Sequence, residues 1–152
     1  MQYWDAYQKN SPPFSDAAVT VMKLKRSGYK LAIVSDSDGT RGMKRKRVEA
    51  VPFRSLFEVL VVAGEDTPKV KPSKAPFRLV ARKLDLPPEE CAYVGDNPQT
   101  DIAGAKAVGM TTILIRRKPY SVPTSSSSSG SVPRPSFEIT ALKEIPSLVA
   151  GQ

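Results

Sequence analysis

The sequence predicts an α/β fold with a mostly parallel sheet. Helical and apolar extended segments alternate strictly along residues 16–115, and such alternation is typical of parallel sheets whose strands are joined by helices. The extended segments are short, nearly continuous apolar runs such as Val59 to Ala63. Strands that are buried on both faces of a parallel sheet have this composition.

The first half of the chain is expected to contain two helix–strand pairs. Apolar side chains at helical spacing predict a helix over residues 16–27, and Gly28 is placed to end it. The apolar run that follows predicts a strand over residues 31–35. After a polar turn we expect a basic helix over residues 41–50 and a second strand over residues 59–63.

The second half continues the alternation. An amphipathic helix is predicted over residues 75–84, a strand over residues 91–95, and a helix of small residues over 99–108 that Gly109 ends. Residues 111–115 then form another apolar strand. This order completes the core of an α/β domain.

A proline- and serine-rich segment, residues 119–136, interrupts the pattern and is expected to be a flexible surface loop. Residues 137–139 after it are predicted to form a last short strand. A short helix over residues 141–150 is expected to be interrupted or tilted at Pro146. We therefore assign residues 15–118 and 137–152 to one core.

Composition limits the chemistry. The chain has 152 residues, no histidine, one cysteine and a formal net charge of +8. A Ser-His-Asp triad, a disulfide and a zinc site built from histidine and cysteine are therefore excluded. No apolar run approaches the ~18 residues of a membrane span, and the start of the chain does not resemble a signal peptide, so we expect a cytoplasmic protein. The positive charge favours an anionic partner, such as a small phosphorylated metabolite.

Two carboxylates follow the strand at residues 91–95. Asp96 comes at the end of the strand, and Asp101 lies five residues later at the start of the next helix. Their side chains can face one site, and a hard cation such as Mg²⁺ takes one or two carboxylates together with water and substrate phosphate. The alternative is structural: Asp96 in a turn, and Asp101 stabilising the positive end of a helix.

Two further positions suit phosphate binding. Lys71 is held beside Pro72 and can neutralise a phosphate, although a loop lysine is often only solvated. Ser35 offers a hydroxyl at a strand end, followed by backbone N–H groups that can bind phosphate oxygen. The alternative for Ser35-Asp36 is an ordinary turn.

The basic run between Arg41 and Arg47 is either a nucleic-acid-binding patch or a solvated helix face. No aromatic residue lies within it for stacking on bases, so we do not expect nucleic acid to be a partner. Cys91 begins an apolar strand and is expected to be a small core residue.

In this order, the segments resemble the haloacid dehalogenase (HAD) superfamily, subfamily I phosphatase type. Ser35 matches the second family motif, and Lys71 in the sequence Lys-Pro-Ser-Lys matches the third. The segment from Gly95 to Asp101 matches the fourth. The resemblance implies a Rossmann-like three-layer fold and Mg²⁺-dependent hydrolysis of a small phosphate monoester through an aspartyl-phosphate. It also implies that Ser35, Asp36 and Lys71 bind phosphate, with Lys71 catalytic, and that Asp96 and Asp101 bind the metal.

The family's first motif is a D-x-D sequence on a central first strand, and we expect this chain to lack it. Residues 1–14 resemble only the end of a helical cap. The strand at 31–35 is then expected either to close directly against the strand at 91–95 or to leave a gap that another chain fills. On this interpretation the chain is truncated, and weak or inactive alone.

Two alternatives remain. Asp36 and Asp38 form a D-x-D-G-T sequence after an apolar strand and could act as a displaced first motif, with Asp36 as nucleophile and Asp38 as acid and base. Otherwise the chain is a non-catalytic binding or assembly module, or one half of a split enzyme.

Overall fold

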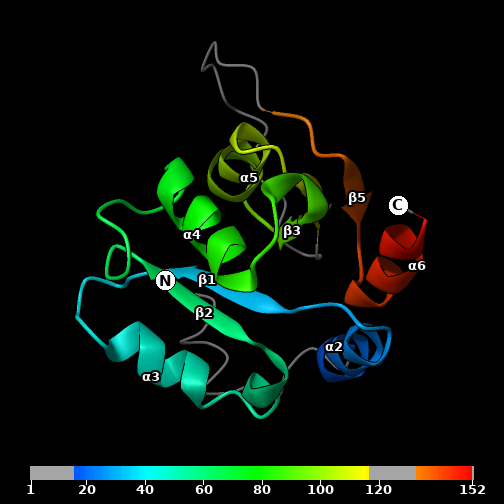
Figure 1. Cartoon of the computed structure of the whole chain (residues 1–152), viewed down its shortest axis with the longest axis horizontal. Coiled ribbons are helices and arrows are strands. Elements are labelled where there is room, and N and C mark those ends of the chain that lie inside the picture. Colours follow the sequence, from blue (N-terminus) through cyan, green and yellow to red (C-terminus); the bar gives the residue numbers. More distant parts are fainter. Residues whose placement is uncertain (1–15, 117–132, 152) are drawn as a thin grey trace.

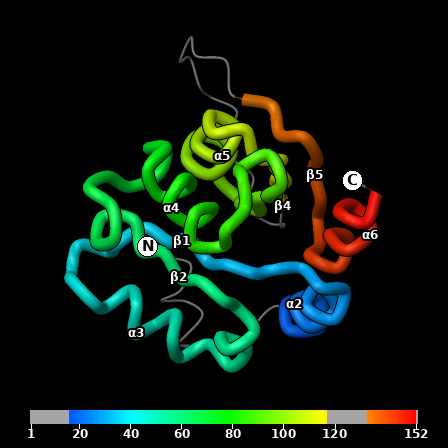
Figure 2. The backbone as a smooth tube through the Cα atoms, in the orientation of Figure 1, coloured from blue at the N-terminus to red at the C-terminus, as the bar shows by residue number. Residues whose placement is uncertain are grey.

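The predicted α/β fold is confirmed in a computed structural model that describes residues 16–116 and 133–151. Parallel strands lie between two groups of helices, as Figures 1 and 2 show. The expected cap remnant at residues 1–14 and most of the serine-rich loop lie outside the described residues. No helix in the described part is long and apolar enough to cross a membrane.

The described strands form two separate sheets. In the first, β1 (Ala32–Asp36) pairs in parallel with β2 (Val59–Ala63). In the second, β4 (Thr111–Ile115) lies between β3 (Ala92–Gly95) and β5 (Phe137–Ile139), and all are parallel. Because β1 and β3 do not pair within the described residues, the expectation that they close directly against each other is wrong.

Burial along the strands is unusual for a parallel sheet. All residues of β2 and β4 except the first of each are buried. In contrast, Ser35 is the only buried residue of β1, and β3 has none. Inner strands of such sheets are normally covered on both faces. The greater exposure of β1 and β3 goes with the position of each at the edge of its sheet, where one side has no described strand.

Helices cover both faces of the strands. On one face, α4 (Lys74–Leu84) and α5 (Ala103–Ala107) pack against side chains of β1, β2 and β3. On the other face, α3 (Met43–Glu49) packs on the first sheet, and α2 (Ala17–Arg26) and α6 (Ile145–Ala150) pack on the second. This gives the three layers that the family resemblance implies.

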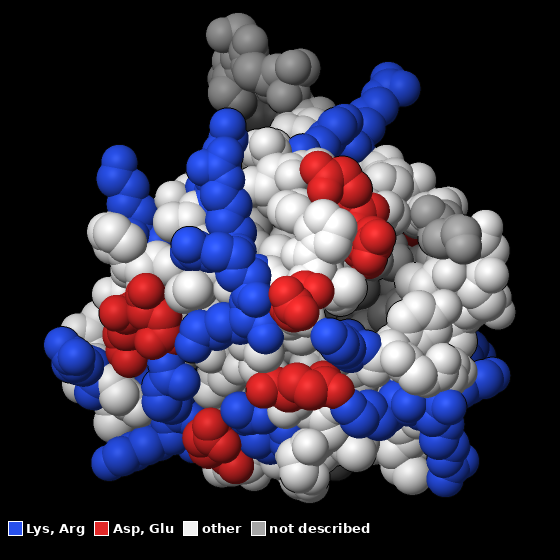
Figure 3. All heavy atoms as spheres, in the orientation of Figure 1, with Lys and Arg blue, Asp and Glu red and all other residues white. Residues whose placement is uncertain are grey.

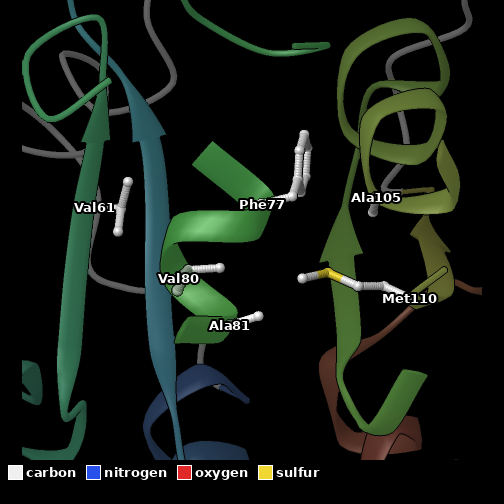
Figure 4. Close-up of a cluster of buried hydrophobic side chains, with 6 residues drawn as sticks. All are labelled: Val61, Phe77, Val80, Ala81, Ala105 and Met110. Atoms are coloured by element: carbon white, nitrogen blue, oxygen red, sulfur yellow. The ribbon is translucent and has the colours of Figure 1, made fainter. Parts of the chain in front are cut away.

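A cluster of buried side chains under α4 joins the two sheets (Figure 4). Phe77 of α4 is fully buried and contacts the edge of Tyr93 of β3, with ring centroids 4.9 Å apart. Val61 of β2 lies in the same cluster. A Cβ atom on Gly104 would lie 2.2 Å from the Phe77 ring, so glycine is required there for α5 to approach α4.

The helices after β3 and β5 differ from expectation. The helix predicted over 99–108 is a π-helical turn, Pro98–Ile102, followed by the short α5. The last helix begins with a 3₁₀ turn, Leu142–Glu144, and Pro146 lies in the first turn of α6 instead of interrupting it. Proline is tolerated at that position because the first helical N–H groups have no intrahelical partner.

Candidate functional site

Polar side chains gather where β1 and β3 end. Asp36 is the last residue of β1, and Asp96 directly follows β3. The carboxyl ends of parallel strands lie at one edge, which is where ligands bind in α/β proteins. The buried Ser35 lies beside Asp36, and its hydroxyl forms no hydrogen bond with any residue that the structure describes. The hydroxyl is therefore available to a ligand.

Lys71, in the segment between β2 and α4, connects the two strand ends. Its backbone N–H donates to Oδ1 of Asp36 at 3.0 Å, and its Nζ donates to Oδ1 of Asp101 at 2.5 Å. The Lys71 and Asp101 side chains are only 13% and 7% exposed. The structure thus brings together Ser35, Asp36, Lys71 and Asp101, which are distant in sequence.

Asp101 is held by backbone groups as well as by Lys71. Its Oδ2 accepts hydrogen bonds from the N–H groups of Asp96, at 3.2 Å, and Asn97, at 3.1 Å. A Cβ atom on Gly95 would lie 2.4 Å from the Cβ of Asp101. The Gly-Asp sequence is therefore needed because only glycine lets Asp101 pack back against the end of β3.

Tyr93 belongs to this site, and the sequence analysis missed it. Its hydroxyl accepts a hydrogen bond from Nζ of Lys71 at 3.5 Å, and the Lys71 cation lies 6.0 Å from the ring centroid. The sequence offered one sign of this role, because Tyr93 is a residue with a hydroxyl group in an otherwise apolar predicted strand.

The electrostatics keep Lys71 charged. Burial by itself lowers the pKa of Lys71, but the charges of ionised Tyr93 and of Asp101, with the hydrogen bond to Asp101, raise that pKa on balance. Burial also raises the pKa of Tyr93, so its phenol is neutral near pH 7. The carboxylate that pairs directly with the Lys71 ammonium group is that of Asp101.

Asp96 differs from Asp101 in its surroundings. It is exposed on one side, yet partial burial and then the charge of Asp101 raise its pKa. A carboxylate whose ionised form is disfavoured by a neighbouring anion is one that a cation would stabilise.

These residues fit a magnesium ion only in part. Mg²⁺ binds through one or two carboxylates with water completing the shell, and Asp96 meets that need. Both oxygens of Asp101 are already engaged by Lys71 and backbone N–H groups. The described residues contain no cluster of three or more potential ligands, so Asp101 as a direct ligand stays a prediction.

The turn after β1 is fixed by internal ion pairs. Arg47 lies 3.0 Å from Oδ2 of Asp38, and both side chains are largely buried. Arg45 pairs with Asp66 at 2.6 Å, and Lys44 is 1% exposed. The basic run is therefore not a uniformly solvated helix face, since several of its cations hold the turn and the helix in place.

Known proteins resemble this chain. The family model for haloacid dehalogenase-like hydrolases matches residues 1–115. Glyceraldehyde 3-phosphate phosphatase of Methanopyrus kandleri is 36% identical over 110 residues, 71% of this chain and 45% of that protein. Ribulose-1,5-bisphosphate 5-phosphatase of Halopiger xanaduensis is 31% identical over 149 residues, 97% of this chain and 61% of that protein.

A solved structure agrees with the sequence comparisons. The crystal structure of a HAD phosphatase from Thermococcus onnurineus superposes with a TM-score of 0.75 at 27% identity. The superposition covers 91% of this chain and 59% of that one. The chain thus spans about half the length of the relatives that it matches.

Proposed function

The chain belongs to the haloacid dehalogenase-like hydrolase family, and we propose that it supplies the phosphate-binding and metal-binding part of a phosphatase for small phosphate monoesters. The observation that carries this proposal is that Lys71 contacts both Asp36, at the end of β1, and Asp101, which packs on the end of β3. Ser35 and Asp96 lie at the same two strand ends. The two curated relatives named above are phosphatases of small phosphorylated molecules by name.

In this proposal Lys71 is the main phosphate ligand. A cation that stays charged near pH 7 stabilises the charge that develops on the phosphoryl oxygens. The hydroxyl of Ser35, which is free of described partners, donates to the same phosphate, and the backbone that follows Asp36 offers further N–H groups. Asp101 acts as a positioning residue because it fixes the Lys71 ammonium group.

Magnesium is the proposed cofactor, held on the protein side by Asp96, with Asp101 behind it. When bound, the ion would neutralise phosphate charge and orient the ester for in-line attack. Asp96 is the better direct ligand because its carboxylate is exposed and lacks a cation partner among the described residues.

The chemistry also needs a nucleophile, and we propose that an inserted strand supplies it. A carboxylate at the end of that strand would attack phosphorus, and the bond to the ester oxygen would break as the alcohol leaves with a proton. Water would then attack the phosphorus of the aspartyl-phosphate, releasing inorganic phosphate and regenerating the carboxylate.

The place proposed for this strand is the space between β1 and β3. Each of these strands has a pairing partner on one side only within the described residues, and both are less buried than β2 and β4. An unpaired strand edge is a template for a further strand. A partner chain that adds this strand in parallel would join the two sheets and place its last residues beside Lys71.

Asp36 and Asp38 are a weaker alternative as nucleophile and acid–base pair. Asp36 accepts the backbone N–H of Lys71, and Asp38 is paired with Arg47, so both carboxylates already have structural partners. A non-catalytic binding module remains the outcome to expect if phosphate binds and no strand restores turnover. We also propose a cytoplasmic location, which fractionation of the source cells tests.

Phosphate binding by the chain alone tests the site without requiring a nucleophile. Isothermal titration with inorganic phosphate in the presence of Mg²⁺ should show binding that Lys71→Gln weakens about tenfold or more, the scale of losing a charge-assisted hydrogen bond. Lys69→Gln is the matched control, because Lys69 is exposed in the same segment. Equal affinities of all three proteins would contradict the assignment of Lys71.

A further inference from the structure

A cavity lies along α4, next to the segment that follows β2. It has a volume of about 530 Å³ and is formed by α4, the segment around Thr67 and Pro68, and the connector from Leu86 to Pro88. Ser35, Lys71, Asp96 and Asp101 are not among its lining residues. Ligand sites in proteins commonly enclose about 300–1,000 Å³, so the size suits a small organic molecule.

The wall of this cavity is largely apolar. Leu79, Leu86, Pro68 and Pro88 contribute to it. The two polar residues at its edge already have partners: Asp66 pairs with Arg45, and the hydroxyl of Thr67 donates to the carbonyl of Lys69. The apolar wall favours a ligand with a flat or apolar body.

Two arginines give the cavity its charge. Arg78 and Arg82 line it one helical turn apart and are exposed. Their guanidinium groups form no hydrogen bond or ion pair with any residue in the described ranges. Lys74 extends the same row, and Figure 3 shows basic side chains gathered over α4. Four other arginines of the described residues pair with carboxylates, namely Arg45, Arg47, Arg54 and Arg116. Arg26, Arg41 and Arg134, like Arg78 and Arg82, form no ion pair with a described residue, but they do not line the cavity.

We propose that this cavity is a second ligand site, for an aromatic phosphate of the nucleotide class. A guanidinium group can donate two parallel hydrogen bonds to phosphate oxygens, and it can also stack on an aromatic ring. The apolar wall would cover the base. The repulsion expected from Asp66 is reduced because Arg45 neutralises it at 2.6 Å. The site is independent of the proposed hydrolysis, since no residue assigned to that reaction lines it.

Calorimetric titration with adenosine 5′-monophosphate tests the proposal. Binding is measured in the Lys71→Gln chain, because this substitution removes the phosphate ligand proposed at the strand ends. Adenosine monophosphate should still bind this chain, and adding Arg78→Gln and Arg82→Gln should weaken that binding about tenfold or more. Lys83→Gln is the matched control, since Lys83 is exposed on α4 but does not line the cavity. Added to the Lys71→Gln chain, it should leave binding unchanged.

Separate probes test the two parts of the ligand. Adenosine and inorganic phosphate should each bind to this site far more weakly than the monophosphate, because each occupies only half of it. The proposal is overturned if the Lys71→Gln chain does not bind adenosine monophosphate, or if adding both arginine substitutions weakens binding no more than adding Lys83→Gln. Binding that disappears in Lys71→Gln would instead assign the nucleotide to the strand ends.

Discussion

Substituting Gly95 by alanine should disturb the site through steric contact alone. The new methyl group would lie 2.4 Å from Cβ and 2.6 Å from Cγ of Asp101, and Asp101 has little freedom to retreat. Its two oxygens are held by Lys71 and by two backbone N–H groups. Since Gly95 does not have a positive φ, the substitution adds no backbone strain, and the contact with Asp101 determines the result.

The magnitude follows from two opposing effects. Overpacking a filled site costs about 1–3 kcal/mol, and displacing Asp101 weakens a buried ion pair whose complete disruption costs about 3–5 kcal/mol. Replacing glycine in a strand returns only about 0.5–1 kcal/mol through backbone entropy. We therefore expect a net loss of about 2–4 kcal/mol, which lowers the melting temperature by about 4–16 °C in a chain of this size.

Thermal unfolding monitored by circular dichroism measures this change. Gly151→Ala is the control, because it has no positive φ and a Cβ atom there would meet nothing closer than 3.7 Å. That variant should stay within about 0.5 kcal/mol of the wild type, as surface substitutions do. Equal melting temperatures for Gly95→Ala and Gly151→Ala would refute the close packing of Asp101 on β3.

Other changes have equally definite outcomes. Lys71→Met leaves the buried Asp101 carboxylate without its cation and should cost about 3–5 kcal/mol in urea unfolding; adding Asp101→Asn should recover part of that loss, and strictly additive losses would contradict the pairing. Ser73→Ala removes the side-chain cap on the N–H of Ala75 at the start of α4 and should lower the free energy of unfolding by about 1 kcal/mol. Ser73→Gly should lower it by only a few tenths of a kcal/mol. Asp96→Asn should stabilise the metal-free chain at pH 7, because the folded state raises the pKa of Asp96 and therefore disfavours its ionised form. This gain in stability should shrink as the pH falls through the raised pKa and vanish below about pH 4. The variant should also lose any rise in melting temperature that Mg²⁺ gives the wild type. An Asp96→Asn variant that is less stable than the wild type at pH 7 would contradict the raised pKa of Asp96.

The parts of the fold that local patterns determine were predictable. The strands at 59–63, 111–115 and 137–139 have the predicted bounds, because continuous apolar runs between turn residues leave little choice. The π-helical turn at Pro98–Ile102 was not predictable from spacing. It accompanies the return of the Asp101 carboxylate to the N–H groups of Asp96 and Asn97, which is a tertiary requirement.

The site shows the same division. Ser35, Lys71, Asp96 and Asp101 were each identified from their positions after strands or in a motif, and the structure brings Lys71 and Asp101 together. The role of Tyr93 depends on the approach of Lys71 from a different segment, which no local pattern contains.

The basic helix illustrates a further limit. From the local sequence, lysines and arginines that form ion pairs cannot be distinguished from those that are only solvated on a helix face. Arg47 and Arg45 find their partners in Asp38 and Asp66, and only the folded chain brings these carboxylates close.

Phosphatase turnover with an added strand tests the central claim most directly. Hydrolysis of p-nitrophenyl phosphate with Mg²⁺ is measured for the chain alone and with a synthetic apolar peptide that ends in D-x-D-G-T. We predict little turnover by the chain alone, and turnover with the peptide that is lost with Lys71→Gln or when asparagine replaces the first aspartate of the peptide. Robust turnover by the chain alone that Asp36→Asn abolishes, or no turnover with the peptide, would contradict the account.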